Sequence, residues 1–303
     1  MIETDVHFPT DINVLLDAMR KVIMLTARVC CAFGVEGWRQ SGHNLEKIQK
    51  RYRRAQKLKG STSQDEIKKA RQQAVIKEAY QAYIDMAQEF VERAQASLSE
   101  LRQKGCPAIL ELMHIEGYIK HARRQIDQVR RRVLQGEVIP HNEKVFSIFE
   151  EHTEWICKGK AGVPQELGLK VCIVEDQYQF ILHHRVMEQE TDEQVAVVMA
   201  QETKERFAEF SSCSYDKGFH SPTNRERLEE ILDSVVLPKK GKLSVPDKER
   251  EHSSEFVHAR YMHSAVESAI NAVENHGLDR CLDHGLEGFK RYVGLYSNQA
   301  KLD

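Results

Sequence analysis

The chain has 303 residues, 41% of them hydrophobic, which is enough for one large domain or two ordinary ones with a buried core. Its 44 Lys and Arg residues nearly balance its 46 Asp and Glu residues, so affinity for nucleic acid must come from local clusters of charge. The seven cysteines show no CxxC pair or zinc-like spacing, and the sequence has neither a signal peptide nor an apolar run long enough to cross a bilayer. These features argue against a zinc module and a membrane protein, and they predict a cytoplasmic chain with reduced thiols.

The first part of the chain predicts one strand followed by a long helical region. Residues 1–10 alternate polar and apolar side chains, which is the strand period, and Asp11 can cap the helix that follows. A domain rarely opens on a strand, so we expect an N-terminal part to be missing. Residues 11–136 are rich in helix formers, with breaks at 59–63 and 104–107 that predict antiparallel helices.

After residue 137 the pattern changes to alternating strands and helices. The predicted elements, in order, are a β-hairpin over 166–187, a helix over 191–207 capped by Thr191 or Asp192, a short strand ending at Asp216, a helix from Ser221 or Thr223, a strand over 234–238 and a helix near 255–275. This alternation predicts an α/β domain over 137–293 that continues the first strand, interrupted early by the helical insertion, with a divergent tail over 294–303.

Asp216 is the first candidate for chemistry. It ends the run "SCSYD" and is followed by "KGFHS", so it can lie at the carboxyl end of a strand, where α/β folds place their sites. Gly218 would let the backbone turn away and leave the carboxylate free. The alternative is an ordinary solvated turn residue beside a glycine.

The helix near 255–275 supplies a second candidate carboxylate. Its helical spacing predicts an apolar stripe of Met262, Val266, Ile270 and Val273 beside a polar stripe of Arg260, His263, Glu267, Asn271 and Glu274. Glu267 would lie at the edge of the buried face, where a carboxylate can bind a divalent cation, with Arg260 and His263 nearby for phosphate or orientation. An ordinary solvent-facing glutamate is the alternative.

Two basic clusters in the helical region, 47–60 and 118–133, predict positive helix faces with interleaved tyrosines. Such faces neutralise phosphates and give salt-sensitive nucleic-acid affinity, although a charged helix face is also commonly just solvated. The candidate DNA contacts are Lys47, Lys50, Arg51, Arg53, Arg54, Lys57, Arg123, Arg124, Arg130 and Arg131, with Lys217, Arg260 and His263 from the α/β part.

Three segments together resemble a known family. They are "ETDVHFPTDINVLLDAMRKVI", "SYDKGFHSPTNRERLEEILDSVVLPKKG" and "RYMHSAVESAINAVENHGLDRCLDHGLEGFKRYV", and each resembles the corresponding part of DDE transposases of bacterial insertion sequences. The resemblance extends to about Val293. It implies an RNase H-like mixed sheet with flanking helices, interrupted after the first strand by a large all-helical insertion.

The resemblance also implies the catalytic acids. The family's second acid falls on Asp216 and its third on Glu267, and Arg260 matches a basic residue of the same helix. The family's first aspartate lies a few residues before the first of the three segments, and Asp5 is the nearest acid in this chain. This departure and the divergent tail lead us to expect an N-terminally truncated copy.

The activity implied by the resemblance is metal-dependent cleavage and transfer of DNA strands at insertion-sequence ends. Two Mg²⁺ ions, with Mn²⁺ as substitute, would be held by three carboxylates and activate water or a DNA 3′-hydroxyl. The expected partners are terminal inverted repeats and target DNA, bound by a homodimer associated with the nucleoid. The alternative is a truncated, inactive remnant that retains DNA binding or helical dimerisation.

Overall fold

The structure is a computed structural model that describes residues 1–157, 165–263, 266, 270–271 and 274–299. It divides into two compact units. The helical unit comprises His7–Glu151, and the α/β unit comprises Met1–Val6 together with His152–Asp303. The chain is therefore a mixed α/β protein in which one unit is wholly helical.

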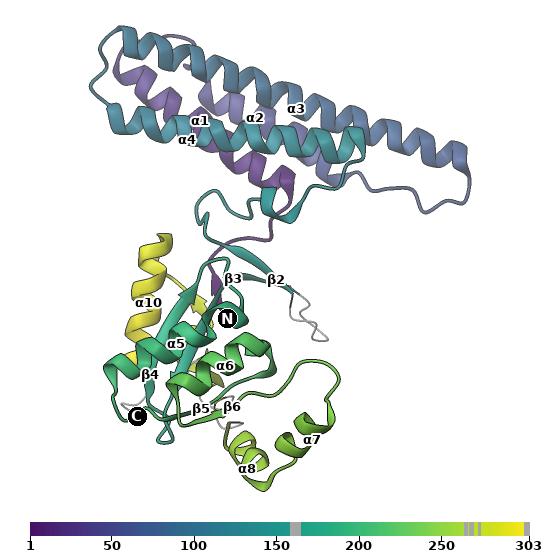
Figure 1. The fold of residues 1–303 in the computed structure, drawn as a ribbon. Coiled ribbons are helices and arrows are strands. Elements are labelled where there is room, and N and C mark those ends of the chain that lie inside the picture. Colours follow the sequence, from purple (N-terminus) through teal and green to yellow (C-terminus); the bar gives the residue numbers. More distant parts are fainter. Residues whose placement is uncertain (158–164, 264–265, 267–269, 272–273, 300–303) are drawn as a thin grey trace. The chain divides into compact units, whose positions relative to one another are not determined.

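The helical unit is an up-and-down bundle (Figure 1) of four helices: α1 (Asp11–Ala32), α2 (Ser41–Lys57), α3 (Glu66–Gln103) and α4 (Ile109–Val129). The two predicted breaks, at 59–63 and 104–107, are confirmed. A third break after α1 was not predicted, although it contains Gly34 and Gly37, both in the left-handed region that favours glycine. Thr10, not Asp11, caps α1, because the Thr10 hydroxyl accepts a hydrogen bond from the Asn13 amide.

The end of α4 and the core of the bundle follow from local chemistry. One π-helical turn, η1 (Arg130–Gln135), continues α4 until Gly136 ends it with a φ of 77°. The core is a continuous apolar cluster, and the fully buried Tyr83 donates a hydrogen bond to the Ile12 carbonyl at 3.2 Å. Trp38, in the connection between α1 and α2, donates a hydrogen bond to the Ser97 hydroxyl of α3 at 2.9 Å and so joins this connection to the bundle.

The main sheet of the α/β unit has the order β2-β3-β1-β7, with β4 paired to β3. Its strands are β1 (Ile2–Thr4), β2 (Glu154–Cys157), β3 (Gln165–Glu175), β4 (Ile181–Met187) and β7 (Arg280–Cys281). Among the strand pairs of this sheet in the described ranges, β1–β7 is parallel and the others are antiparallel, so the sheet is mixed. β1 is shorter than the predicted strand because the chain turns at once, with the Val6 amide donating to the Thr4 carbonyl at 2.8 Å.

The predicted hairpin over 166–187 is confirmed as β3 and β4. Its turn is held by Asp176, whose carboxylate accepts from the amides of Tyr178 at 2.9 Å and Phe180 at 2.7 Å. Gly168 of β3 is required by packing rather than by a turn, because a Cβ there would collide with the β1 backbone at Ile2. Local side-chain chemistry and one close approach thus fix the middle of the sheet.

The rest of the unit surrounds a second, two-stranded parallel sheet. Its elements are α5 (Asp192–Arg206), β5 (Ser212–Ser214), η3 (Lys217–Phe219), α6 (Pro222–Ile231), β6 (Ser234–Val236), α7 (Val245–Glu251) and α8 (Ser254–His263). At each of the two predicted helix starts the structure selects the first alternative: Thr191, not Asp192, forms a capping box on α5, and Ser221, not Thr223, caps α6, its hydroxyl accepting from the Asn224 amide.

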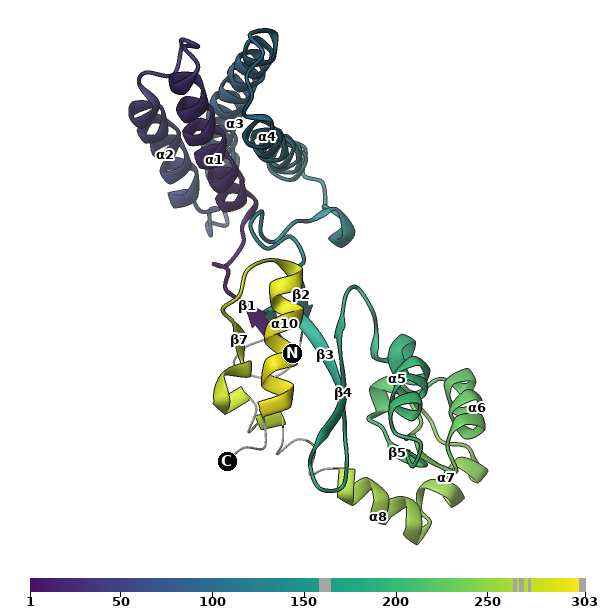
Figure 2. The same cartoon turned by 90° about the vertical axis from the view of Figure 1, so that its left-hand side faces the viewer.

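The C-terminal part of the described chain covers the main sheet. After the π-helical turn η4 (Glu274–Leu278), α10 (Gly285–Gln299) packs beside β4 and β7 (Figure 2). Its Phe289 and Val293 are buried against Ile2 and Leu169 of the sheet. None of the helices in the described ranges is long and apolar enough to span a membrane.

Candidate functional site

Asp216 follows β5 and opens a tight turn. The Tyr215 amide donates to the Val236 carbonyl at 2.9 Å, so the pairing with β6 continues to the residue before Asp216. The Asp216 carbonyl then accepts from the Phe219 amide at 3.1 Å and starts η3. The Tyr215 ring is buried, whereas the Asp216 side chain is 79% exposed. The backbone of Asp216 is therefore fixed while its carboxylate meets solvent.

The Asp216 carboxylate faces the end of α8. His263 Nε2 lies 3.3 Å from Asp216 Oδ1, and Arg260 adds positive charge from the preceding turn of the same helix. The pKa of Asp216 lies below its ordinary value, chiefly because of the hydrogen bond from His263; partial burial opposes this shift, and the charges of His263 and Arg260 add smaller lowering contributions. The site therefore favours an ionised Asp216.

Ser214 completes this group on the other side of the imidazole ring. Its Oγ lies 2.8 Å from His263 Nδ1, so the ring is placed between a hydroxyl and a carboxylate. Sequence composition alone does not mark Ser214 as a site residue. The signal was nevertheless present, because side chains two apart on a strand point to the same face and Ser214 precedes Asp216 by two residues.

The turn after Asp216 is held by two neighbours. A Cβ added at Gly218 would lie 2.6 Å from Asp192 Oδ2, at the start of α5. The Gly218 carbonyl also accepts a hydrogen bond from Lys240 Nζ at 2.6 Å. Gly218 is outside the left-handed region, so its role differs from the one expected from the sequence. It is small so that α5 can approach, not because the backbone needs special freedom.

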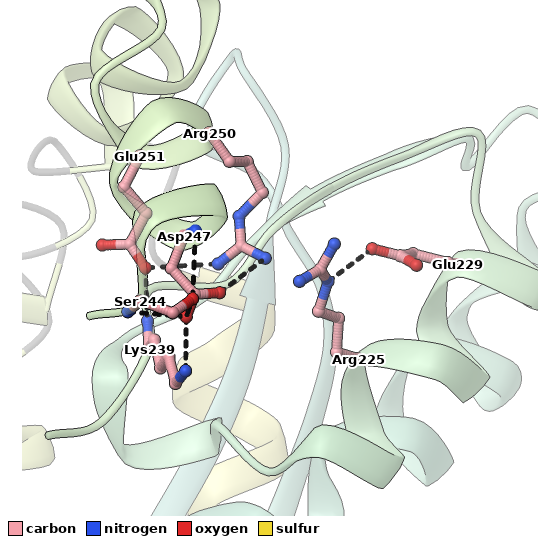
Figure 3. A network of polar contacts seen from close by, with 7 residues as sticks. All are labelled: Arg225, Glu229, Lys239, Ser244, Asp247, Arg250 and Glu251. Carbon is pink, nitrogen blue, oxygen red and sulfur yellow. Dashed lines mark hydrogen bonds and ion pairs between the residues drawn. The ribbon is translucent and has the colours of Figure 1, made fainter. Parts of the chain in front are cut away.

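The loop that carries Lys240 is itself braced by a polar network (Figure 3). The Asp247 carboxylate accepts from the Ser244 amide at 3.1 Å, in a capping box on α7, and also binds Lys239 Nζ. The Lys239 amide donates to Glu251 Oε1 at 2.8 Å, and Arg250 donates to the same oxygen at 3.2 Å. The hydrogen bond from Lys239 is the main reason that the pKa of Asp247 is strongly lowered.

In the same view, Arg225 pairs with Glu229 one turn along α6, at 2.8 Å, separately from the α7 network. The contacts of Lys239 with Asp247 and Glu251, not the Arg225–Glu229 pair, hold the conformation of the loop between β6 and α8. Neither Lys239 nor Lys240 was singled out from the sequence, because their partners are distant along the chain.

Of the other two predicted acids, the structure describes Asp5, and no contact within the described ranges joins it to Asp216. Asp5 follows β1 in the main sheet, is half-exposed, and forms an ion pair with Arg280 of β7. Glu267 lies outside the described residues. Among the residues that the structure describes, no group of three or more His, Cys, Asp or Glu side chains is arranged to hold a metal ion.

The apolar stripe predicted for the helix near 255–275 is wrong at two positions. Met262 is 53% exposed and Ile270 is 39% exposed. The buried anchor of α8 is instead Phe256, and His263 lies on the same side because the two are seven residues apart. Helix α8 is thus rotated relative to the predicted orientation, which turns His263 toward β5.

The basic face of α2 is exposed and little neutralised. Lys47, Lys50, Arg53, Arg54 and Lys57 are exposed, whereas Arg51 is half-buried. Apart from an Arg54–Glu78 pair at 3.5 Å, no ion pair engages these six cations among the described residues. A hollow of about 450 Å³ follows this face and is lined by Glu46, Gln49, Lys50, Arg53, Arg54 and Lys57. Tyr52 does not join the face, since its hydroxyl donates to Asn13 at 2.5 Å inside the bundle.

The basic cluster of α4 and η1 is different, because most of its side chains have partners within the bundle. Arg131 is held by Glu143 at 2.6 Å, Glu137 at 2.8 Å and Asp127 at 3.4 Å. Arg123 and Arg130 donate to the side-chain amides of glutamines on α3. Arg124 is exposed, as are Lys217 and Arg260 in the other unit. Of the two predicted basic faces, only that of α2 presents a continuous set of available charges.

Comparisons with protein-family models, with curated proteins and with solved structures found no match for this chain.

Proposed function

We propose that this protein is a DDE-type transposase, a metal-dependent enzyme that cleaves DNA strands at insertion-sequence ends and transfers them, and that its α/β unit has an RNase H-like core. The observation that carries the proposal is the placement of Asp216. It is an exposed, readily ionised carboxylate at the end of a strand, with His263 and Arg260 of α8 beside it. The resemblance of three separate segments to this family supports the same conclusion.

The donor chemistry at Asp216 suits a hard divalent cation. Mg²⁺ and Mn²⁺ prefer carboxylate oxygens and retain several water ligands, so an exposed Asp that His263 engages through one oxygen is a suitable donor. Asp5, as the structure has it, is less suitable because Arg280 neutralises it and it follows a strand of the other sheet. In the proposal, Asp216 and Glu267 are two of the acids that would hold the two cations, and Asp5 is the candidate in this chain for the third.

The chain's own residues would bind and orient the DNA. A bound cation pair would supply an activated oxygen nucleophile and stabilise the leaving oxygen in an in-line displacement. Lys217 is the residue after Asp216, and Arg260 of α8 lies near Asp216 in space; both are exposed and would contact the phosphates of the scissile strand. The α2 face would bind backbone phosphates, since it presents a set of exposed Lys and Arg side chains.

Cleavage of DNA that carries the terminal inverted repeats is the test. We expect nicking with Mg²⁺ or Mn²⁺ and none with EDTA, and we expect Asp216→Asn and Glu267→Gln each to abolish it. Asp233→Asn is the matched control, because Asp233 is an exposed aspartate beside β6 whose backbone, rather than its side chain, is bonded. Metal-dependent nicking that survives Asp216→Asn would refute the assignment.

A second function, DNA binding without catalysis, is favoured by the Asp5–Arg280 pair together with the available α2 charges. This candidate predicts salt-sensitive duplex binding that is the same with Mg²⁺ and with EDTA, and no nicking by the wild type. The cleavage assay therefore separates the two candidates directly.

A further inference from the structure

Helix α8 lies close to β5 (Figure 1), and a series of polar side-chain contacts joins the two elements. Ser214 Oγ lies 2.8 Å from His263 Nδ1, and His263 Nε2 lies 3.3 Å from Asp216 Oδ1. Ser214 and Asp216 flank one imidazole ring although they belong to the same short segment. Each ring nitrogen therefore has one partner of defined chemistry.

The chemistry of the partners determines where the ring proton lies. An ionised carboxylate can only accept, so Nε2 carries the hydrogen that faces Asp216. In the neutral ring Nδ1 is then an acceptor, and the Ser214 hydroxyl donates to it. If the ring gains a proton at Nδ1, the hydroxyl rotates and accepts. Nε2–H donates to Asp216 in both states, so the direction of this hydrogen bond does not change when the ring gains a proton.

Both ends of this series are anchored in the fold. Ser214 pairs with Val236 in the parallel ladder, and the next residue, Tyr215, is buried on the opposite face of the strand. On α8, the buried Phe256 fixes the helix, with its amide bonded to the Ser253 hydroxyl at 3.2 Å. The serine therefore occupies a fixed position relative to the His263 ring.

We propose that Ser214 is a positioning residue, which holds the His263 ring so that Nε2–H orients the Asp216 carboxylate for a divalent cation. The proposal rests on the proposed function in one respect, namely that Asp216 binds the cation. His263 contacts Oδ1 of Asp216, so Oδ2 is the oxygen that would bind the cation. Hydrogen-bonded partners behind a metal ligand typically change metal affinity by about 10–100-fold when they are removed.

The test compares Ser214→Ala with Ser214→Thr and Ser212→Ala in the full chain. Threonine keeps the hydroxyl and suits a strand. Ser212 lies on the same face of β5, is exposed, and is the matched control. The ¹⁵N resonances of the neutral His263 ring, recorded without metal, report the contact directly. We expect an Nε2–H form with a hydrogen-bonded Nδ1 in the wild type, Ser214→Thr and Ser212→Ala, and loss of the Nδ1 hydrogen bond in Ser214→Ala.

The second readout is Mn²⁺ affinity, measured by electron paramagnetic resonance. Ser214→Ala should weaken binding by about 10-fold, the lower end of the range for direct partners of a metal ligand, because Ser214 acts on Asp216 through His263; Ser214→Thr and Ser212→Ala should stay near the wild type. Any of three results would overturn the proposal: an Nδ1–H form in the wild type, an unchanged Nδ1 resonance in Ser214→Ala, or equal Mn²⁺ affinity in the wild type and Ser214→Ala. If the resonances behave as expected and the wild type binds no Mn²⁺, the contact with His263 stands and the metal-dependent function fails.

Discussion

Removal of two charges from the α2 face should reduce the salt dependence of DNA binding by a calculable amount. Four cations line the hollow on this face: Lys50, Arg53, Arg54 and Lys57. If each neutralises one phosphate, log K falls with log[salt] with a slope of about −3.6, because each phosphate contributes about −0.9 for duplex DNA. Between about 50 and 200 mM salt, the wild type would then lose about 150-fold in affinity.

The perturbation is the double variant Lys50→Gln with Arg53→Gln, since neither side chain has an ion pair in the described part of the bundle. We expect the slope to fall to about −1.8 and the loss over the same range to about 12-fold, equally for any duplex sequence. Fluorescence anisotropy with a labelled duplex in EDTA measures the slope without any contribution from cleavage.

The control removes the same net charge elsewhere in the helical unit. Lys68 and Lys69 pair with Asp65 at 3.8 Å and Glu66 at 2.9 Å at the start of α3, so Lys68→Gln with Lys69→Gln should leave the slope unchanged. Equal slopes for the two double variants would show that net charge, rather than the α2 face, controls binding. An unchanged slope in the α2 variant would leave that face as solvated surface.

Two further predictions concern the turn at Asp216. Gly218→Ala should destabilise the fold by about 1 kcal/mol, the lower end for overpacking, because the new Cβ meets the movable carboxylate of Asp192. Urea unfolding measures this, and Gly60→Ala, with open space at its Cβ, should change stability by less than about 0.5 kcal/mol; equal effects would contradict the packing argument. His263→Ala should raise the pKa of Asp216 toward its ordinary value, measured by ¹³C NMR of the carboxyl group. Because the folded pKa is lowered, the stabilisation by this pair is present above the unfolded pKa, about 3.9, and is lost as pH falls through the folded value; an unchanged pKa in the variant would contradict the assignment of its cause.

Features with a local cause were predictable from the sequence. The β3–β4 hairpin follows from two apolar runs around a polar turn, and the starts of α5 and α6 were predicted to within two candidate residues each, of which Thr191 and Ser221 are the caps. The same applies to Asp216, whose position at the end of a strand was inferred from the run before it.

Features that depend on partners distant in sequence were not predictable. A helical wheel places Arg131 on a positive face, but two of the carboxylates that neutralise it, Glu137 and Glu143, come from the chain beyond the helix. The orientation of α8 was missed because hydrophobicity favoured Met262, whereas packing at Phe256 turns His263 inward. Periodicity describes a helix alone, and the neighbours decide which face is buried.

The polar network around Lys239 also affects how the turn after Asp216 can open. Lys239 is bonded to α7, and the adjacent Lys240 is bonded to the Gly218 carbonyl in the turn after Asp216. Opening of this loop must therefore break the contacts of α7 and those of the Asp216 turn in a single event. Amides of the two segments should exchange with solvent at a common rate, as one cooperative unit that opens and closes together.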